Sequence, residues 1–253
     1  MTTNVLKIEQ LSYSYTGSNR VLDNLELEIQ AGERVGLLGP SGCGKSTLSK
    51  CLVQLEKQNE GNILYKGTNI KELLSSSPLS YRKEVQMIFQ DPASALNPKM
   101  HVGAILTEAM KVHSIGNNRA ERTEKVVELI EKVGLESEHF NRYPHEFSGG
   151  QKQRIGIARA LALEPEIIIC DESVSALDVS VQAQVLNLLN ELKERFSLSY
   201  IFISHDLSVV KHFCDRIVVL NKGCIEEIGF PEDLFEKAKS DYTRKLIEAI
   251  PGK

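Results

Sequence analysis

One stretch constrains the fold of this chain more than any other: Gly39-Pro-Ser-Gly-Cys-Gly-Lys-Ser-Thr47. It matches the phosphate-binding pattern G-x-x-x-x-G-K-S/T without a mismatch. The apolar segment 34–38 before it predicts a buried strand, and apolar residues at positions 48, 52, 53 and 55 predict a helix after it. Because the pattern requires a strand before the loop and a helix after it, the sequence predicts a nucleoside triphosphate site rather than an ordinary glycine-rich turn.

The residues of this loop have distinct expected tasks. Its glycines let backbone N–H groups curl round an anion, and the helix that follows adds the positive end of its dipole. Lys45 is expected to reach the β- and γ-phosphates, and the hydroxyl of Ser46 is expected to bind Mg²⁺. The predicted nucleotide-binding residues are Gly39, Pro40, Ser41, Gly42, Cys43, Gly44, Lys45, Ser46 and Thr47.

Length and composition restrict the class of protein. A chain of 253 residues with 42% hydrophobic and 25% charged residues can build one α/β domain with an inserted subdomain. The net charge of −4 gives no reason to expect nucleic acid as a partner, although a local basic patch is compatible with it.

The five cysteines form no C-x-x-C pair, which is typical of reduced cytosolic thiols. Cys43 is the exception in its position, because a thiol inside the phosphate loop can make the protein sensitive to thiol reagents. The first residues lack an apolar region, so we expect no signal peptide. No apolar run approaches the ~20 residues of a membrane span, so any membrane part must come from other subunits.

Strands alternate with helices along the chain, which favours a parallel α/β sheet. The predicted strands are 5–11, 25–29, 34–38, 60–67, 85–89, 166–170 and 198–203. The predicted helices are 45–55, 102–112, 119–133, 152–163, 179–196 and 207–213. A hairpin is expected around 221–223, a charged amphipathic tail from 231 onward, and within 71–82 a Ser- and Pro-bearing connector at 75–78.

A second chemical signal ends the apolar strand at 166–170. Phosphoryl transfer needs Mg²⁺ near the phosphate loop, and a carboxylate at the tip of a neighbouring strand, here Asp171, can hold it. The adjacent Glu172 can polarise an attacking water. The alternative, a pair of solvated acids at a strand end, is disfavoured by the phosphate loop upstream.

Three more segments are weaker signals on their own. His205 and Gln90 each follow a strand at the edge where parallel sheets bind ligands, although a lone histidine rarely indicates a function. Ser148-Gly-Gly-Gln151 places a capping serine and two glycines at a helix start, which makes a second anion site. Because the chain has only one triphosphate-binding loop, this second anion site suggests that Ser148–Gln151 completes the nucleotide site of another copy of the fold. Tyr15 can stack on a purine ring, but a tyrosine packed on the sheet is the more usual reading.

Together these motifs resemble an ATPase subunit of an ABC transporter over nearly the whole chain. The resemblance implies ATP and Mg²⁺ as cofactors and a P-loop NTPase fold of the α/β class. The expected parts are a RecA-like parallel sheet core, an N-terminal antiparallel β subdomain and an inserted helical signature subdomain. We expect the core at 1–90 and 164–230, the helical subdomain at 91–163 and a helical tail at 231–253.

The family resemblance also implies roles for individual residues. The implied catalytic residues are Glu172, His205 and Lys45, and the implied metal ligands are Ser46, Gln90 and Asp171. The further nucleotide-binding residues are the adenine-stacking Tyr15, the signature residues Ser148, Gly149, Gly150 and Gln151, and Asp178 of the D-loop 175–178. In this family the signature loop faces the γ-phosphate of ATP bound to the opposite subunit. The chain departs from the family pattern at Phe147, where leucine is commoner, and at Ser173, where proline is common.

Within the family, the segments 89–98, 141–150, 175–184 and 242–246 resemble the dipeptide, oligopeptide and nickel import branch. That branch pairs two ATPases with two membrane permease subunits and an extracytoplasmic substrate-binding protein. The chain resembles the second ATPase, at the cytoplasmic face of the membrane. Many peptide-importing relatives carry a longer Cys-containing C-terminal extension, so an end at Lys253 weakens the expectation of an oligopeptide importer and leaves a dipeptide or nickel importer open.

Two other functional classes remain as alternatives. A soluble ABC-type ATPase acting on DNA or ribosomes usually carries coiled-coil insertions or two fused cassettes, and this sequence has neither. A regulatory module that binds nucleotide without turnover is disfavoured by Glu172 and His205. The sequence leaves open the cargo and whether the partner ATPase is identical or a sister chain.

Overall fold

The computed structural model describes residues 4–15, 19–175 and 177–249. The strands are β1 (Asn4–Tyr13), β2 (Leu22–Gln30), β3 (Arg34–Leu38), β4 (Glu60–Tyr65), β5 (Thr68–Asn69), β6 (Val85–Ile88), β7 (Ile167–Asp171), β8 (Ser199–Ile203), β9 (Arg216–Asn221) and β10 (Cys224–Gly229). The α-helices are α1 (Lys45–Leu52), α2 (Ile70–Ser76), α3 (Pro78–Glu84), α4 (Val102–Val112), α5 (Arg119–Lys132), α6 (Gly149–Leu161), α7 (Val179–Phe196), α8 (Leu207–Phe213), α9 (Pro231–Lys237) and α10 (Asp241–Glu248). Two 3₁₀ turns are η1 (Ser137–Asn141) and η2 (Pro144–Glu146).

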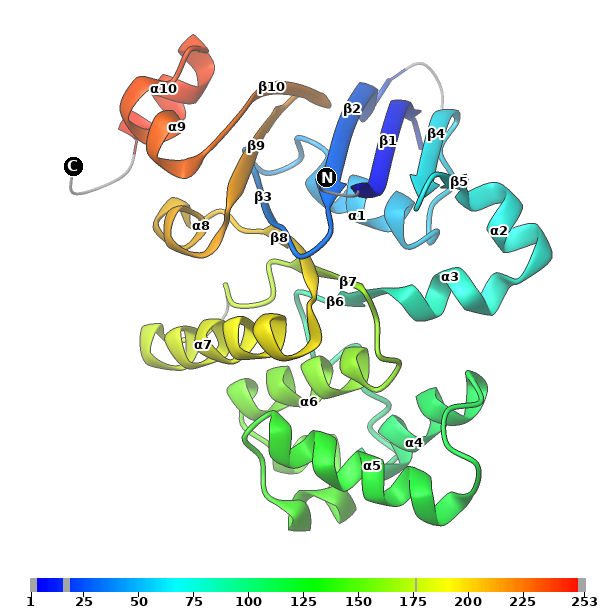
Figure 1. Cartoon of the computed structure of the whole chain (residues 1–253). Coiled ribbons are helices and arrows are strands. Elements are labelled where there is room, and N and C mark those ends of the chain that lie inside the picture. Colours follow the sequence, from blue (N-terminus) through cyan, green and yellow to red (C-terminus); the bar gives the residue numbers. More distant parts are fainter. Residues whose placement is uncertain (1–3, 16–18, 176, 250–253) are drawn as a thin grey trace.

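A six-stranded sheet in the order β10-β9-β3-β8-β7-β6 forms the centre of the molecule (Figure 1). Neighbouring strands from β9 to β6 pair in parallel, and only β10 joins antiparallel at the edge. Every residue of β7 and β8 is buried, as expected for strands covered on both faces. The α/β class and the parallel core predicted from sequence are confirmed.

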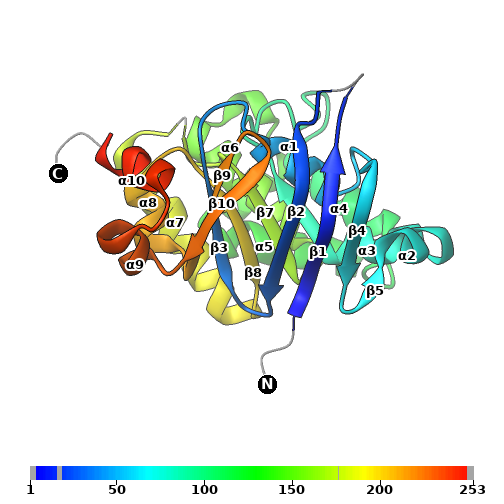
Figure 2. The ribbon, with the colours of Figure 1, turned by 90° about the horizontal axis from the view of Figure 1, so that it is seen from above.

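A second sheet in the order β2-β1-β4-β5 is antiparallel, and its strands lie side by side in Figure 2. β2 alternates buried and exposed residues, because one face of this sheet packs inward. The inward face shares one hydrophobic core with α1 and with one face of the six-stranded sheet. This core holds α1, and therefore the loop that precedes it, between the two sheets.

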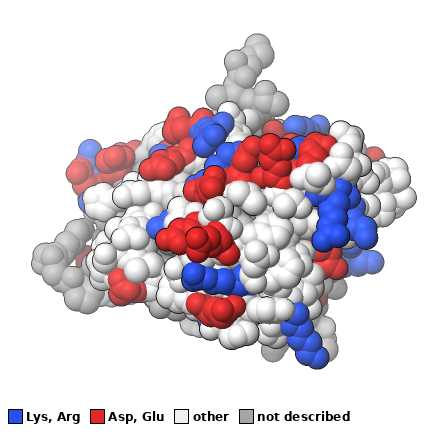
Figure 3. Space-filling view, turned by 90° about the horizontal axis from the view of Figure 1, so that it is seen from below, with Lys and Arg blue, Asp and Glu red and all other residues white. Residues whose placement is uncertain are grey.

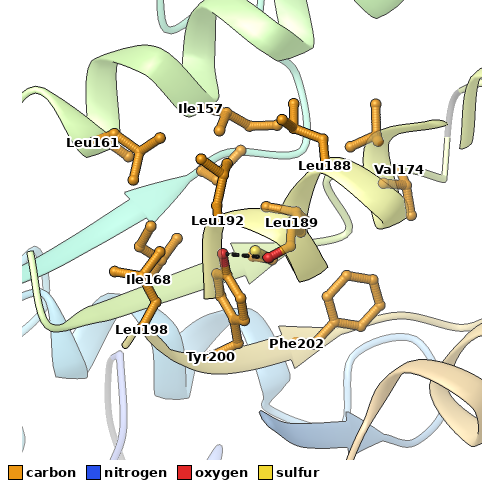
Figure 4. Close-up of a cluster of buried hydrophobic side chains, with 14 of the residues drawn as sticks. Ile157, Leu161, Ile168, Val174, Leu188, Leu189, Leu192, Leu198, Tyr200 and Phe202 are labelled. Carbon is orange, nitrogen blue, oxygen red and sulfur yellow. Dashed lines mark hydrogen bonds between the residues drawn. The ribbon is translucent and has the colours of Figure 1, made fainter. Parts of the chain in front are cut away.

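Helices α6, α7 and α8 cover the other face of the six-stranded sheet and form a second core with it. Figure 4 shows Leu188, Leu189 and Leu192 of α7 packed over Tyr200 and Phe202 of β8. The Tyr200 hydroxyl, buried with its ring, donates a hydrogen bond of 3.0 Å to the backbone carbonyl of Leu189. A strand of the sheet is thereby hydrogen-bonded to the helix that covers it.

We expect Tyr200→Phe to lower the free energy of unfolding by about 1–2 kcal/mol, because a buried carbonyl loses its hydroxyl partner while the ring packing is kept. Urea unfolding followed by circular dichroism measures this as a lower midpoint with an unchanged slope. Tyr143→Phe, on an exposed side chain, is the matched control and should leave the midpoint unchanged. Equal midpoints for Tyr200→Phe and the wild type would contradict the prediction.

Helices α4 and α5 pack against α6 and form a layer at the bottom of Figure 1. This layer occupies the segment where the sequence predicts an inserted subdomain, whose boundaries remain an interpretation. α6 begins at Gly149 rather than at the predicted residue 152, because Ser148 caps it. The Ser148 hydroxyl accepts from the Gln151 N–H at 3.3 Å, and the Gln151 side chain accepts from the Ser148 N–H at 3.0 Å.

Two sequence predictions about helices are wrong. The connector predicted at 75–78 is only one residue long, because α2 continues to Ser76, α3 begins at Pro78 and Ser77 alone separates them. Asn69 caps α2 by accepting from the Lys71 N–H, and Pro78 occupies the first turn of α3, where a missing N–H costs nothing. α1 ends at Leu52 rather than 55, because Gln54 adopts a left-handed conformation with φ of 59°.

Charged side chains of both signs are interspersed on the face seen in Figure 3, without a continuous basic field. Among the helices that the structure describes, none has the length and hydropathy of a membrane span. All five cysteines are free thiols, and four of them, including Cys43, are buried.

Candidate functional site

The phosphate loop follows β3 and ends where α1 begins. Gly42 and Gly44 have φ of 77° and 112°, in the region that favours glycine. A Cβ on Gly44 would lie 2.6 Å from the Leu22 side chain, whereas a Cβ on Gly42 would meet no atom within 4 Å. The loop is braced from outside, since the Gly223 N–H donates to the Cys43 carbonyl at 3.0 Å. The glycines therefore allow a backbone conformation that packs the loop against the protein at Gly44 and leaves it open at Gly42.

Lys45 lies inside this loop and is only 6% exposed. Its Nζ donates to the carbonyls of Gly39 and Pro40, at 2.8 and 3.0 Å. A buried ammonium needs such partners because burial removes its hydration. The positive charge of Lys45 thus lies within the loop, beside the first N–H groups of α1. Together the charge and these N–H groups favour the binding of an anion.

Ser46 and Asp171 meet across the gap between α1 and β7. The Ser46 Oγ donates to Asp171 Oδ1 at 3.2 Å. Burial raises the pKa of the Asp171 carboxyl above its ordinary value, the Ser46 hydrogen bond opposes this, and the charge of Glu172 raises it further. A hydroxyl and a carboxylate side by side are the oxygen ligands that Mg²⁺ prefers. This pair, next to Lys45, fits a magnesium ion that accompanies phosphates.

Three polar side chains converge where β6, β7 and β8 end. Gln90 Nε2 donates to Glu172 Oε2 at 3.0 Å, and His205 Nδ1 lies 3.6 Å from the same oxygen. Glu172 has φ of 46°, so the chain turns sharply after Asp171. The structure therefore brings together an amide, a carboxylate and an imidazole from three segments far apart in sequence. Their chemical roles remain predictions.

Tyr15 lies beside the phosphate loop. Its hydroxyl is 3.2 Å from Thr47 Oγ1, and the residue is 52% exposed. The buried tyrosine of this segment is Tyr13, which contacts the Tyr15 ring edge-on with the ring centroids 4.9 Å apart. Tyr13 also donates from its hydroxyl to Glu56 Oε2 at 2.6 Å. Packing on the sheet, the alternative considered for Tyr15, thus applies to Tyr13, and the Tyr15 ring is available for stacking.

The loop Ser148–Gln151 lies at the start of α6, against the start of α7. A Cβ on Gly150 would come within 2.5 Å of the Val181 side chain, so only glycine fits this contact. Within the described residues, no hydrogen bond joins this loop to residues 39–47. Asp178 caps α7 by accepting from the Val181 N–H at 3.0 Å. Residue 176 of the predicted D-loop lies outside the described residues.

Sequence reasoning missed two arginines of α6. Arg159 donates to the carbonyl of Ala95, in the loop that follows Gln90, and burial lowers the pKa of its guanidinium. Arg154 donates to the carbonyl of Val133 at 2.7 Å and to Gln184 Oε1 of α7 at 3.2 Å. A charged residue inside the apolar run 155–163 is the sequence signal that could have identified Arg159.

Comparison with known proteins identifies relatives over almost the whole chain. Residues 22–175 match the family described as ABC transporter. The chain is 47% identical to the oligopeptide transport ATP-binding protein OppF of Bacillus subtilis, over 99% of this chain and 84% of that protein. It is 46% identical to OppF of Streptococcus mutans, over 97% of this chain and 80% of that protein.

Solved structures of ABC transporter cassettes also match this chain. The structure of cbiO1 from Clostridium perfringens, part of the ABC transporter complex cbiONQ, matches with a TM-score of 0.82 and 27% identity. The match covers 98% of this chain and 96% of that one. A dimeric post-hydrolysis structure of the ATP-binding cassette MJ0796, bound to ADP and Pi, matches with a TM-score of 0.80 and 29% identity. That match covers 89% of this chain and 98% of the other.

Proposed function

Because this chain belongs to the ABC transporter family, we propose that it is the ATP-hydrolysing subunit of an importer for peptides. One observation supports hydrolysis above all: Gln90 and His205 converge on Glu172, where one carboxylate oxygen accepts a hydrogen bond from Gln90 and lies 3.6 Å from the His205 imidazole. A module that only binds nucleotide has no need of this arrangement. The soluble ATPase alternative has no support among these relatives.

The chain's own residues supply most of the proposed chemistry. Lys45 and the backbone N–H groups at the start of α1 bind the β- and γ-phosphates of ATP and stabilise the charge that develops on them. Glu172 accepts a proton from the attacking water and orients it in line with the γ-phosphate. His205 holds the γ-phosphate and this water in position, and the exposed ring of Tyr15 stacks on adenine.

Mg²⁺ is the cofactor that the Ser46 and Asp171 pair fits, with Gln90 as a further proposed ligand. When bound, the ion neutralises phosphate charge and polarises the γ-phosphoryl group. The ionised form of Asp171 is the one that can hold this ion. Ser46 contributes there, since its hydrogen bond favours the charged form of Asp171.

We propose that the active unit contains two ATPase chains, identical or sister. The capped loop Ser148–Gln151 offers free N–H groups at a helix start and makes no hydrogen bond to the phosphate loop of its own chain within the described residues. In a pair, it faces the γ-phosphate on the partner, with Asp178 near the contact. Two membrane permease subunits and an extracytoplasmic substrate-binding protein complete the system, with this chain at the cytoplasmic face.

The proposed cargo follows from the relatives. The names of both sequence relatives specify oligopeptide transport, which favours peptides over the nickel that the sequence branch left open. Uptake of a labelled dipeptide, a labelled oligopeptide and ⁶³Ni²⁺ by cells carrying wild-type or Glu172→Gln protein tests this proposal. We expect peptide uptake to fall to background in the variant while nickel uptake is unchanged.

Glu191→Gln, on an exposed residue of α7, is the control for this experiment and should support normal uptake. Loss of nickel uptake alone would replace peptide by nickel as the cargo. Normal uptake of all three cargoes, with the purified wild-type chain hydrolysing ATP, would contradict the import role and leave the ATPase assignment intact.

A further inference from the structure

A pocket of about 510 Å³ lies between the end of α1 and the two short helices α2 and α3, at the right of Figure 1. Its wall contains Lys57, Gln58, Lys71, Leu74, Pro78 and Arg82. The phosphate loop precedes α1, whereas Lys57 and Gln58 follow it. The eight residues of α1, about 12 Å of helix, therefore separate this pocket from the nucleotide site.

The charge of the pocket wall is entirely positive. Lys57, Lys71 and Arg82 line it, and no carboxylate does. Within the part of the chain that the structure describes, none of these three side chains forms an ion pair or a side-chain hydrogen bond. Glu56, next to Lys57 in sequence, accepts from the Tyr13 hydroxyl, and Glu72, next to Lys71, is not part of the wall. All three residues are exposed, and a bound anion would supply the counter-charge that they lack.

The side-chain amide of Gln58 is an uncharged hydrogen-bond donor at the pocket. Gln58 lines the pocket and is only 6% exposed. Its Nε2 has no hydrogen-bond partner among the described residues, while its Oε1 lies 3.4 Å from Gln54 Nε2. Buried amide donors in folded proteins almost always have an acceptor. The pocket wall thus contains a buried side-chain N–H group without a hydrogen-bond acceptor and three cations without a counter-charge.

We propose that this pocket binds a phosphate group. A phosphate oxyanion accepts several hydrogen bonds at once, and the planar guanidinium of Arg82 suits it bidentately while Lys57 and Lys71 contribute point charges. Leu74 and Pro78 form an apolar wall against which the carbon part of a phosphate ester packs. The phosphate has two possible sources, a free phosphate compound or the headgroup of an anionic lipid, and the experiment separates them.

Inorganic phosphate is the first probe, titrated into the full chain saturated with Mg-ADP so that the phosphate loop is occupied. The side-chain amide resonance of Gln58 and the backbone amides of Lys71 and Ser75 report on the pocket by NMR. We expect saturable shifts at these positions that weaken as salt is raised, because the attraction is between charges. Shifts confined to residues 39–47, or none at all, would overturn the proposal.

Variants connect these shifts to the proposed ligands. Arg82→Gln should weaken phosphate binding at least about tenfold, as expected for loss of hydrogen bonds to a charged group. Gln58→Leu should weaken it several-fold without changing the salt dependence, since it removes a donor and no charge. Lys83→Gln, on the same helix but outside the pocket wall, is the matched control and should bind phosphate normally. Equal weakening by Arg82→Gln and Lys83→Gln would indicate diffuse surface charge and overturn the pocket.

Vesicles identify the source of the phosphate. If it is a lipid headgroup, the wild type sediments with phosphatidylglycerol vesicles, not with phosphatidylcholine vesicles, and Arg82→Gln abolishes sedimentation while Lys83→Gln does not. If the phosphate shifts occur without vesicle binding, the pocket serves a free phosphate compound. ATP hydrolysis by Arg82→Gln should equal that of the wild type, because within the described residues the Arg82 side chain forms no hydrogen bond or ion pair with Lys45, Glu172 or His205.

Discussion

Glu172→Gln should reduce the rate of ATP hydrolysis at least about 10²-fold, the contribution expected of a general base, while ATP binding changes little. Glutamine keeps the shape of the side chain and can still contact Gln90, but its amide cannot accept a proton. Phosphate release measures the rate, and a fluorescent ATP analogue measures the affinity. In the presence of Mg-ATP we expect the variant to accumulate as a dimer in size-exclusion chromatography, since the closed pair reopens after hydrolysis.

Glu191→Gln is again the control, because it makes the same chemical change on an exposed helix residue. His205→Ala should lower the rate without trapping the dimer as fully, because it removes a positioning contact 3.6 Å from the carboxylate and leaves the base in place. Hydrolysis at the wild-type rate by Glu172→Gln would contradict the proposed role of Glu172 as the general base. The prediction that the phosphate loop binds nucleotide would not be affected by that result.

Lys45→Ala should weaken ATP binding at least about tenfold, since hydrogen bonds to charged groups contribute about 1.5–3 kcal/mol each. The ammonium is buried in the loop and is hydrogen-bonded to two loop carbonyls, so its removal takes away the main positive charge facing the phosphates. Equilibrium binding of a fluorescent ATP analogue measures the loss. Adenosine, which has no phosphate, should bind the variant and the wild type equally.

The loss of two internal hydrogen bonds can also alter the fold of the Lys45→Ala protein, so thermal unfolding is measured alongside. Lys237→Ala, on an exposed helix residue, controls for the loss of one positive charge. An ATP affinity for Lys45→Ala within twofold of the wild type, in a folded protein, would contradict the role of this loop. Equal weakening of adenosine binding would show instead that the site is distorted.

Periodic patterns predicted most of the regular elements, because burial imposes them directly on the sequence. The strand predicted at 198–203 and the helices predicted at 179–196 and 207–213 agree with β8, α7 and α8 to within one residue. Predictions failed where a single side chain decides a boundary. Asn69 and Ser148 cap helices that begin in polar, Ser- or Gly-containing segments, and hydrophobic periodicity carries no signal there.

The pair Tyr13 and Tyr15 illustrates a different limit. Both tyrosines lie in one segment with the same local chemistry, yet one is buried and hydrogen-bonded to Glu56 while the other is exposed beside Thr47. Which tyrosine is free to stack depends on how β1 pairs with its neighbours. Strand pairing is a long-range property, so no local pattern distinguishes the two residues.

The sequence by itself determined the phosphate loop, the α/β class and the residue types at the strand ends, because each depends on neighbours within a few positions. The tertiary structure decided which of these residues meet. Gln90, Glu172 and His205 lie on three loops up to 115 residues apart, and only the parallel pairing of β6, β7 and β8 places them around one oxygen. The same holds for the pocket of Gln58 and Arg82, which exists only because α2 and α3 fold back beside the end of α1.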